Sequence, residues 1–177
     1  MEAAYVSNEA YARYLGTALY SLYDNNKDEK ELNVHVVSIC MQYTSLKRLK
    51  ETAKIFKRKI NIINFDDIKY KLGNSSDTGR FDYSIMGRLF LGELLPESVK
   101  KVIYLDCDTI VLGSLKKLWR LALYSNIMAA VPEPTVNKSI KEKAGLYKDG
   151  LYYNSGVLLI NLSLWRKENI KDKLLAY

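Results

Sequence analysis

The stretch VIYLDCDTIVLGSL, residues 102–115, determines how the rest of the sequence is interpreted. An apolar run typical of a buried strand ends in two carboxylates, Asp106 and Asp108, and apolar residues resume at Ile110. Carboxylates are rarely buried unless they are paired with a cation or bind a metal. In an extended chain both Asp side chains point to the same side, while Cys107 points the other way. We therefore interpret this stretch as a strand that leads into a binding site.

Strand-like and helix-like segments alternate around this stretch. Runs rich in Val, Ile and other apolar residues predict strands at 3–6, 32–40, 59–65, 126–132 and from 154 onward. Apolar residues at helical spacing predict helices at 10–26, 46–58 (capped by Thr44 or Ser45), 84–96, 114–123 and, in part, 136–150, with a loop at 71–82. This alternation predicts an α/β domain whose mostly parallel central sheet is flanked by helices. Ligands of such sheets bind at the carboxyl ends of strands, which is where the Asp pair stands.

Length and composition are those of an ordinary globular domain. The 177 residues are 48% apolar and 27% charged, which suits one domain with a sizeable core. Because there is no apolar run of about twenty residues and no signal-peptide pattern, we expect neither a membrane-spanning helix nor a secretory leader. Cys40 and Cys107 are predicted to be small core residues in a reducing cytosol. No Cys/His spacing is typical of a zinc site.

The chain is basic, with a net charge of +7 and a pI of about 9.2. Many of the basic residues lie in the segment 47–59, and the simplest interpretation is a solvated helix surface. The alternative is attraction to an anionic partner such as a membrane surface, a nucleic acid or a phosphorylated substrate. Because no nucleic-acid-binding motif is present, we expect no nucleic-acid partner. We expect a cytoplasmic protein whose basic surface can hold it at the inner face of the membrane.

The Asp pair indicates a particular kind of ligand. Carboxylate oxygens suit Mg²⁺ or Mn²⁺ better than zinc, and an incomplete carboxylate site usually shares its metal with substrate phosphates. The pattern thus indicates a metal bound together with a nucleotide diphosphate. An Asp-x-Asp motif also arises by chance, and the alternative is a surface turn in which Asp108 or Thr109 caps a helix.

Two motifs in order carry a resemblance to a known family. VIYLDCDTIVLGSLKKLW (102–119) is followed, after a basic linker, by YYNSGVLLINLSLWR (152–166). Together they resemble glycosyltransferase family 8, over a length from about Ala4 to the end of the chain. The resemblance implies the GT-A fold and retaining transfer of a hexose from UDP-glucose or UDP-galactose to the hydroxyl of a glycan or glycolipid acceptor. It also implies Mn²⁺ or Mg²⁺ on Asp106 and Asp108, as in the lipopolysaccharide galactosyl- and glucosyltransferases of the family.

The resemblance assigns roles to residues near the nucleotide. In VSNEAYARYLG (6–16), Asn8 and Tyr11 match the residues around the uridine, although the common family residue at the place of Asn8 is Asp. An Asn carbonyl can still accept the uracil N–H. Tyr11 would stack on the base, and the alternative is a core residue on a helix face. Cys107, between the two Asp, belongs to the same donor-binding stretch.

Two further residues are matched to the donor sugar. Arg88 would bind a sugar hydroxyl or a diphosphate oxygen, and the alternative is a surface ion pair with Asp82 or Glu93. Asn154 would bond donor-sugar hydroxyls, where Gly156 allows close approach of the backbone. The alternative for Asn154 is a cap on the turn before the strand.

The sequence also departs from the family pattern. Family members carry an Asp-Gln-Asp motif and a His metal ligand downstream, and the sequence has neither. The single histidine, His35, lies in a strand-like run and is predicted to be a core or edge-strand residue. We therefore expect residues 1–177 to form one nucleotide-sugar-binding domain without the acceptor-binding and metal-completing part. No residue is indicated as a catalytic nucleophile.

Two other functions stay open. One is a UDP-sugar-binding remnant of the family without activity, which the missing motifs favour. The other is a nucleotidyltransferase, which also uses an acidic pair and Mg²⁺. The second is less favoured because the segment after the first strand is neither glycine-rich nor basic.

Overall fold

The computed structural model describes residues 1–73, 82–143, 145–147 and 150–176, so most of the predicted loop at 71–82 lies outside the described residues. The strands are β1 (Glu2–Asn8), β2 (Asn33–Ile39), β3 (Ile60–Asn64), β4 (Lys101–Leu105), β5 (Met128–Pro132) and β6 (Tyr153–Asn161). The helices are η1 (Glu9–Tyr11), α1 (Ala12–Asp24), α2 (Tyr43–Ile55), α3 (Ile68–Leu72), η3 (Tyr83–Phe90), α4 (Leu91–Leu94), α5 (Lys116–Arg120), α6 (Lys138–Lys143), α7 (Leu162–Lys167) and α8 (Ile170–Leu175), of which η1 and η3 are 3₁₀ helices.

The strands form one six-stranded sheet in the order β3-β2-β1-β4-β6-β5. β1 pairs in parallel with β2 and β4, and β2 pairs in parallel with β3. β6 is antiparallel to both of its neighbours, β4 and β5. The chain builds outward from β1 to β3 on one side and then crosses to β4 on the other, so the strand order switches between β1 and β4. A crevice for a ligand is expected at the carboxyl ends of these two strands.

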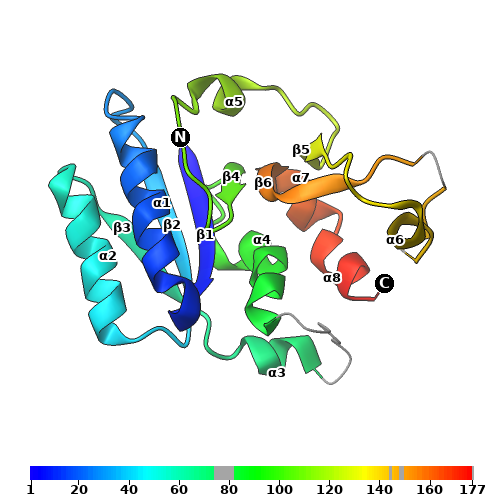
Figure 1. Cartoon of the computed structure of the whole chain (residues 1–177), viewed down its shortest axis with the longest axis horizontal. Coiled ribbons are helices and arrows are strands. Elements are labelled where there is room, and N and C mark those ends of the chain that lie inside the picture. The colour runs from blue at the N-terminus through cyan, green and yellow to red at the C-terminus, as the bar shows by residue number, and fades with distance from the viewer. Residues whose placement is uncertain (74–81, 144, 148–149, 177) are drawn as a thin grey trace.

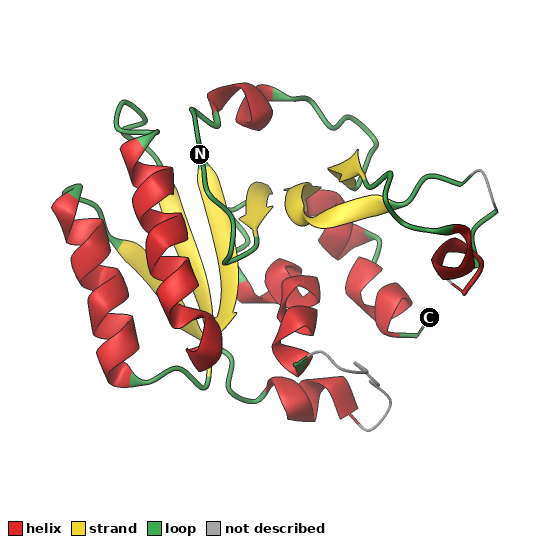
Figure 2. Cartoon of the chain, in the orientation of Figure 1, coloured by secondary structure: helices red, strands yellow, loops and turns green. Residues whose placement is uncertain are grey.

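Helices cover both faces of the sheet (Figures 1 and 2). Residues of α1, α2 and α5 pack on one face, and residues of α3, η3, α4, α7 and α8 pack on the other. The side that carries α1, α2 and α5 forms the first core, and the side that carries α3, η3, α4, α7 and α8 forms the second core. Along β4, Ile103 and Leu105 point into the first core, whereas Val102 and Tyr104 point into the second. A strand covered on both faces needs apolar residues throughout, which explains the continuous run before the Asp pair. The predicted α/β architecture is therefore confirmed.

The apolar run after the Asp pair does not continue the strand. β4 ends at Leu105, and Ile110 and Leu112 are exposed, while Val111 alone of these three is buried. The backbone N–H of Val111 donates to the Ser21 hydroxyl of α1 at 3.0 Å. Val111 thus anchors this loop on the first core, and the apolar run 110–112 is not a strand.

Several local predictions differ from the structure. The predicted helix 46–58 begins earlier, at Tyr43, and its predicted cap Ser45 instead donates its hydroxyl to Glu9 Oε1 at 2.8 Å. The predicted helix 84–96 is split between the 3₁₀ helix η3 and the short α4. Helix α3 was not predicted, because its five residues are too few to show a helical period.

The prediction that Cys40 is a core residue is wrong. Cys40 is exposed and follows the end of β2 with φ of 51°. Its backbone N–H donates to Asp66 Oδ1 at 2.5 Å, so the chain turns away from the sheet here. The apolar run that suggested burial ends one residue earlier, at Ile39.

Arg166 of α7 ties the segment after η3 to the rest of the domain. Its guanidinium donates to the carbonyl oxygens of Gly92 (2.6 Å), Val99 (2.9 Å), Leu95 (3.1 Å) and Pro96 (3.2 Å). These carbonyls lie in α4 and in the turn that leads to β4, where a short helix leaves carbonyls without intrahelical partners. The Pro96 carbonyl also accepts from the Val99 N–H at 2.9 Å. One side chain thereby fixes how α4 and the turn after it sit against α7.

Tight packing around Gly87 of η3 leads to a first prediction. A Cβ at this position would lie 2.6 Å from Val6 Cγ1 and 3.2 Å from Ile39 Cδ1. Because both atoms belong to buried sheet residues, Gly87→Ala should lower the free energy of unfolding by about 1–3 kcal/mol. Gly16→Ala is the matched control, since a Cβ on this helical residue would meet only Leu49 Cδ2 at 3.9 Å.

The control should raise the free energy of unfolding by about 0.5–1 kcal/mol, because Ala favours a helix over Gly. Urea denaturation of both variants measures these changes. Equal effects of the two substitutions would show that η3 does not pack against the sheet as described.

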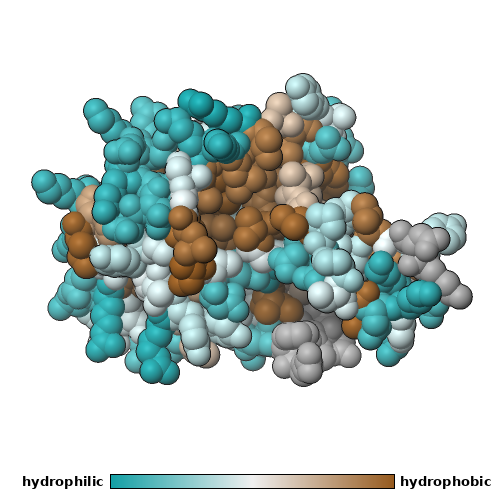
Figure 3. Space-filling model, turned by 45° about the horizontal axis from the view of Figure 1, so that its top comes forward, coloured by the Kyte–Doolittle hydropathy of each residue, from teal (hydrophilic) through white to brown (hydrophobic). Residues whose placement is uncertain are grey.

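The surface has both hydrophilic and apolar regions (Figure 3). Apolar side chains gather on the face that this view turns forward. The segment from β4 to β5 exposes Ile110, Leu112, Leu121, Tyr124 and Met128. Among the described residues, no helix combines the length and the hydropathy that crossing a membrane requires.

Candidate active site

A cleft of about 490 Å³ opens at the carboxyl ends of β1 and β4, where the strand order switches. Its walls come from the end of β1, from η1 and η3, from the turn after β4 and from the chain around the start of β6. The lining residues are Val6, Ser7, Asn8, Tyr11, Ser84, Ile85, Arg88, Tyr104, Asp106, Cys107, Asp108, Tyr152 and Ser155. All predicted site residues except Asn154 are among them. The volume is in the range of sites for small molecules and cofactors.

Asp106 and Asp108 reach the same cleft, as their spacing predicts. Asp106 Oδ1 accepts a hydrogen bond from the Tyr104 hydroxyl at 2.5 Å and lies 3.2 Å from Arg88 Nη2. The backbone N–H of Asp106 donates to the Gly156 carbonyl at 2.8 Å, which joins the end of β4 to β6. Asp108 is exposed and lies two residues further into the turn. One carboxylate is therefore held in place and the other is open to solvent.

Arg88 bridges η3 and the start of β6 across the cleft wall. Its Nη1 donates to the Ser155 carbonyl at 2.9 Å and hydroxyl at 3.0 Å, and its Nε donates to the Ile85 carbonyl at 3.0 Å. The guanidinium also lies over the Tyr104 ring, 4.9 Å from its centroid. Arg88 forms its ion pair with Asp106, and not with Asp82 or Glu93 as the surface alternative required.

Asn8 ends β1 and holds the cleft wall together. Its Oδ1 accepts from the backbone N–H of Tyr11 at 3.2 Å, which caps η1. Its Nδ2 lies 3.1 Å from both Asp82 Oδ1 and the Ser84 hydroxyl, so it links β1 to the start of η3. Burial alone would raise the pKa of the Asp82 carboxyl, but hydrogen bonds from Ser84 and Asn8 outweigh it and the pKa is lowered. Tyr11 is 47% exposed, which excludes the alternative that it is a core residue.

Asn154 lies beside the cleft, near the start of β6, and bonds to its own strand. Its Oδ1 accepts from the backbone N–H of Gly156 at 2.7 Å, and its Nδ2 donates to Glu133 Oε2 at 3.3 Å. A Cβ at Gly156 would lie 3.0 Å from Asp106 Oδ2 and 3.1 Å from Asn154 Oδ1. The glycine thus permits close approach of the Asp106 carboxylate, while the predicted approach of its backbone to a sugar stays a prediction. The bond to Gly156 is local, as the capping alternative requires, but it lies within β6 and not in a turn before the strand. A role of Asn154 toward a sugar stays a prediction.

Cys107 contributes a buried thiol to the floor of the cleft. Its Sγ donates to the Val6 carbonyl at 3.1 Å, and its side chain belongs to the first core. Burial raises the pKa of this thiol to about 12, so the group stays protonated. A role of Cys107 in donor binding stays a prediction.

His35 lies far from the cleft along the sheet. It pairs in register with Ala4 in the first half of β1, whereas the cleft is at the end of β1 near Asn8. The side chain is 4% exposed, and its Nε2 lies 2.8 Å from Glu2 Oε2. This agrees with the predicted core histidine.

Comparison with known proteins identifies the family. The model of a family described as "Glycosyl transferase family 8" matches residues 2–177. The chain belongs to glycosyltransferase family 8. Its curated relatives include general stress protein A of Bacillus subtilis, 31% identical over 97% of this chain and 59% of the relative. Another is lipopolysaccharide 1,3-galactosyltransferase of Salmonella typhimurium, 30% identical over 82% of this chain and 44% of the relative.

Solved structures confirm the fold expected for a family 8 chain. The galactosyltransferase LgtC, in complex with donor and acceptor sugar analogs, aligns with a TM-score of 0.82 and 27% identity over 94% of this chain and 60% of that chain. The bifunctional glycosyltransferase WbbM aligns with a TM-score of 0.80 at 19% identity, which supports the fold alone. The predicted GT-A fold is confirmed. This family 8 chain spans about half the length of the curated relatives that it matches.

The side chains that could bind a metal in this cleft supply some, but not all, of the ligands that a hard divalent cation needs. Two carboxylates from Asp106 and Asp108 are the ligand type that Mg²⁺ and Mn²⁺ prefer. Asp106 Oδ1 is engaged by Tyr104 and Arg88, and Oδ2 lies toward Gly156. Within the described parts of the chain, no group of three or more His, Cys, Asp or Glu residues is placed to hold a metal. The residues present therefore fit a site that a bound diphosphate and water would complete.

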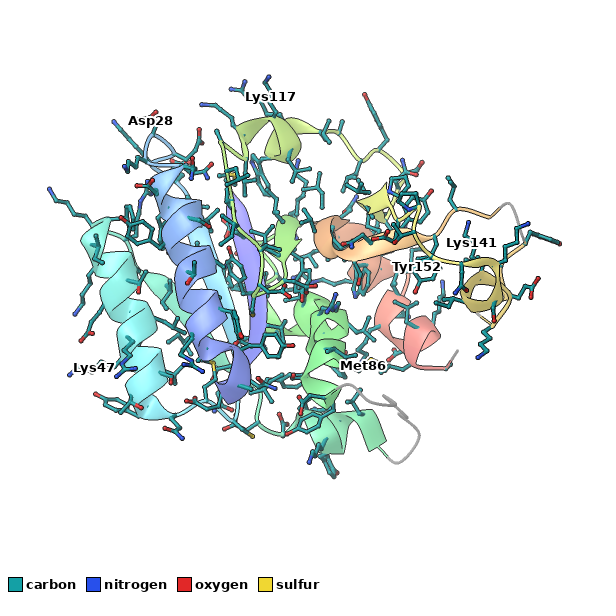
Figure 4. The ribbon with its side chains drawn as sticks, in the orientation of Figure 1. Asp28, Lys47, Met86, Lys117, Lys141 and Tyr152 are labelled. Carbon is teal, nitrogen blue, oxygen red and sulfur yellow. The ribbon has the colours of Figure 1, made fainter. Side chains whose placement is uncertain are left out.

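Sequence reasoning missed several lining residues of this family 8 cleft. Tyr104 could have been found, because it stands two residues before Asp106 and so points to the same side of the strand. Ser155 lies on the wall because β6 pairs with β4, which no local pattern shows. Tyr152, labelled in Figure 4, joins the cleft from just before β6. Ser84 reaches the cleft wall, where Asn8 donates to its hydroxyl, and this contact joins residues too far apart in sequence to be predicted.

Proposed function

We propose that this chain binds the donor in a retaining hexosyltransferase. The enzyme would transfer glucose or galactose from a UDP-sugar to the hydroxyl of a glycan or glycolipid, with Mn²⁺ or Mg²⁺ held by the Asp pair. The observation that carries the proposal is that Asp106 and Asp108 line one cleft at the switch point of a family 8 fold. A named lipopolysaccharide galactosyltransferase among the relatives supports a hexose and a glycan acceptor.

The chemical problem is to break the anomeric C–O bond while a diphosphate leaves. A divalent ion at the diphosphate would act as a Lewis acid toward the charge that develops there. The two carboxylates would bind that ion, and the positive charge of Arg88 faces the same space from the cleft wall. Arg88 and Asn154 would orient the sugar, which lowers the entropic part of the barrier. We assign no nucleophile.

The uridine would lie at the β1 end of the cleft. The Tyr11 ring lies 5.7 Å from the Tyr14 ring, centroid to centroid, and is exposed enough to stack on a base. Asn8 carries a carbonyl oxygen that can accept the uracil N–H in addition to its present bond. Because its amide nitrogen already holds Asp82 and Ser84, Asn8 would also fix the wall against which the nucleotide lies.

We further propose that residues 1–177 act as one donor-binding domain, with acceptor-binding residues and a third metal ligand supplied from outside them. The greater length of the relatives supports this division. We also propose that the protein is cytoplasmic, and the net charge of +7 supports its association with the inner face of the membrane.

Release of UDP from UDP-glucose and UDP-galactose, with and without Mn²⁺, by a longer chain that carries the downstream motifs of the family tests the proposed function. Metal-dependent release of UDP supports a transferase. Binding of either UDP-sugar without turnover supports the alternative of a binding remnant. Formation of pyrophosphate from a sugar phosphate and UTP would replace the proposal by a nucleotidyltransferase.

Gly156→Ala provides a local prediction. The added Cβ would lie within 3.0 Å of Asp106 Oδ2 and so would displace the carboxylate from its present position. We expect affinity for UDP with Mn²⁺ to fall about 10-fold, the range seen when groups around a metal site are disturbed. Gly113→Ala is the control, because a Cβ there meets no atom within 4 Å. Equal affinities of both variants, measured by titration calorimetry, would contradict the placement of Asp106 Oδ2 in the site.

A further inference from the structure

Tyr104 places a polar group inside the second core, directly beneath the cleft. The residue is 2% exposed, and its ring packs among apolar residues of η3, α4 and β6. Its hydroxyl donates to Asp106 Oδ1 at 2.5 Å. A buried hydroxyl that bonds a carboxylate is a strong, charge-assisted contact. The phenol is therefore anchored by packing at one end and fixed to a carboxylate of the cleft at the other.

The same carboxylate oxygen is also held by Arg88. Its Nη2 lies 3.2 Å from Asp106 Oδ1, and its guanidinium lies over the Tyr104 ring at 4.9 Å from the centroid. Two neighbouring donors thus engage one oxygen of Asp106. The other oxygen, Oδ2, lies at the Gly156 side. The arrangement selects one rotation of the carboxylate and leaves one oxygen for a ligand.

We propose that Tyr104 is a positioning residue that holds Asp106 so that Oδ2 faces a cation bound in the cleft. This inference rests on the proposed function, because it requires that Asp106 bind a divalent ion. Two carboxylates close together repel each other, and a free Asp106 side chain would turn away from Asp108 in the absence of metal. Holding Oδ1 in advance removes part of the cost of ordering the ligand.

The test compares the affinity of the chain for UDP with and without Mn²⁺ in Tyr104→Phe. Phenylalanine keeps the buried ring and the contact with Arg88, and it removes only the hydroxyl. We expect the ratio of the two UDP affinities to fall about 10-fold, as for other partners of metal ligands, while UDP affinity without metal changes less than about 2-fold. Because the ratio compares the same sample with and without metal, a lower folded fraction does not alter it.

Tyr5→Phe is the matched control. Tyr5 is fully buried in β1 on the opposite face of the sheet, and among the described residues its hydroxyl has no hydrogen-bond partner. The same substitution there should leave the ratio unchanged. A drop in the ratio equal to that of Tyr104→Phe would show that the effect comes from the core and not from the bond to Asp106.

A double-mutant cycle with Asp106→Asn separates this inference from the proposed function. If Tyr104 acts through Asp106, adding Tyr104→Phe to Asp106→Asn should cause no further loss. If Asp106→Asn lowers the ratio and Tyr104→Phe does not, Tyr104 is no positioning residue and the proposed metal site stands. If neither lowers it, Asp106 binds no metal, and both the inference and the proposed site are wrong.

Discussion

Asp106→Asn and Asp108→Asn should each weaken the binding of UDP in the presence of Mn²⁺ by on the order of 100-fold, more than disturbing a neighbour of a metal ligand does. Both carboxylates line the same cleft, and each substitution removes a negative charge that the proposed cation requires. Without metal, UDP affinity should change little or rise, because a negative charge facing the diphosphate is lost. A loss of UDP affinity with Mn²⁺ but not without metal distinguishes a metal ligand from a residue that contacts the nucleotide.

Asp28→Asn is the control for this pair. Asp28 lies in the loop after α1, away from the cleft, as its label in Figure 4 shows. Calorimetric titration with UDP measures the three variants, and thermal unfolding reports their stability. Asp108→Asn should unfold at an unchanged or higher temperature, because Asp108 is exposed and close to a like charge. A fall in UDP affinity that is the same with and without Mn²⁺ would exclude the Asp pair as a metal site.

The second large effect is coupling between metal and nucleotide. We expect weak Mn²⁺ binding to the 177-residue chain alone, and an affinity higher by up to about 100-fold when UDP is present. Mn²⁺ and Mg²⁺ take about six donors, of which the Asp pair supplies two or three and a diphosphate about two. His35 cannot contribute, because it is buried beside Glu2 toward the other end of β2.

Uridine is the matched control ligand, because it keeps the base and ribose and lacks the phosphates. It should not raise Mn²⁺ affinity. For the same reason of ligand count we expect poor turnover of UDP-sugars by this chain. Tight Mn²⁺ binding without nucleotide would show that the metal site is complete within these residues, as would transfer at the rate of a longer chain that carries the downstream motifs of the family.

Much of the fold was predictable because each element is locally consistent. The strands before the cleft are apolar runs bounded by polar residues, and helix α1 shows a clear helical period from Leu15 to Leu22. The short elements were not predictable in this way. Helix η3 is wound as a 3₁₀ helix whose Gly87 packs on Val6, and such a packing contact has no sequence period. Cys40 shows the same limit, since the end of an apolar run does not reveal which way its last residue turns.

The site was predictable where it follows from a strand and its alternation. Asp106 and Asp108 come to one cleft because they are two residues apart after β4. The partners of these residues depend on pairings that are distant in sequence. Arg88 of η3 contacts Ser155 of β6 because both lie beside β4. Asn8 contacts Asp82 because the start of η3 packs against the end of β1. Residue type and spacing thus identify candidate ligands, and the tertiary fold decides which of their atoms are free.

The place of β6 in the sheet has a consequence for biosynthesis. β6 lies between β4 and β5, although it is translated after both, so β5 leaves the ribosome before its neighbouring strand exists. β1, β2 and β3 can pair as soon as they emerge, because they adjoin one another in the sheet. The Asp pair is then present on a nascent chain whose opposite wall, at Ser155, has not been made. If the chain binds a donor nucleotide as proposed, that ligand can protect the growing protein from misfolding or proteolysis only after translation has passed β6.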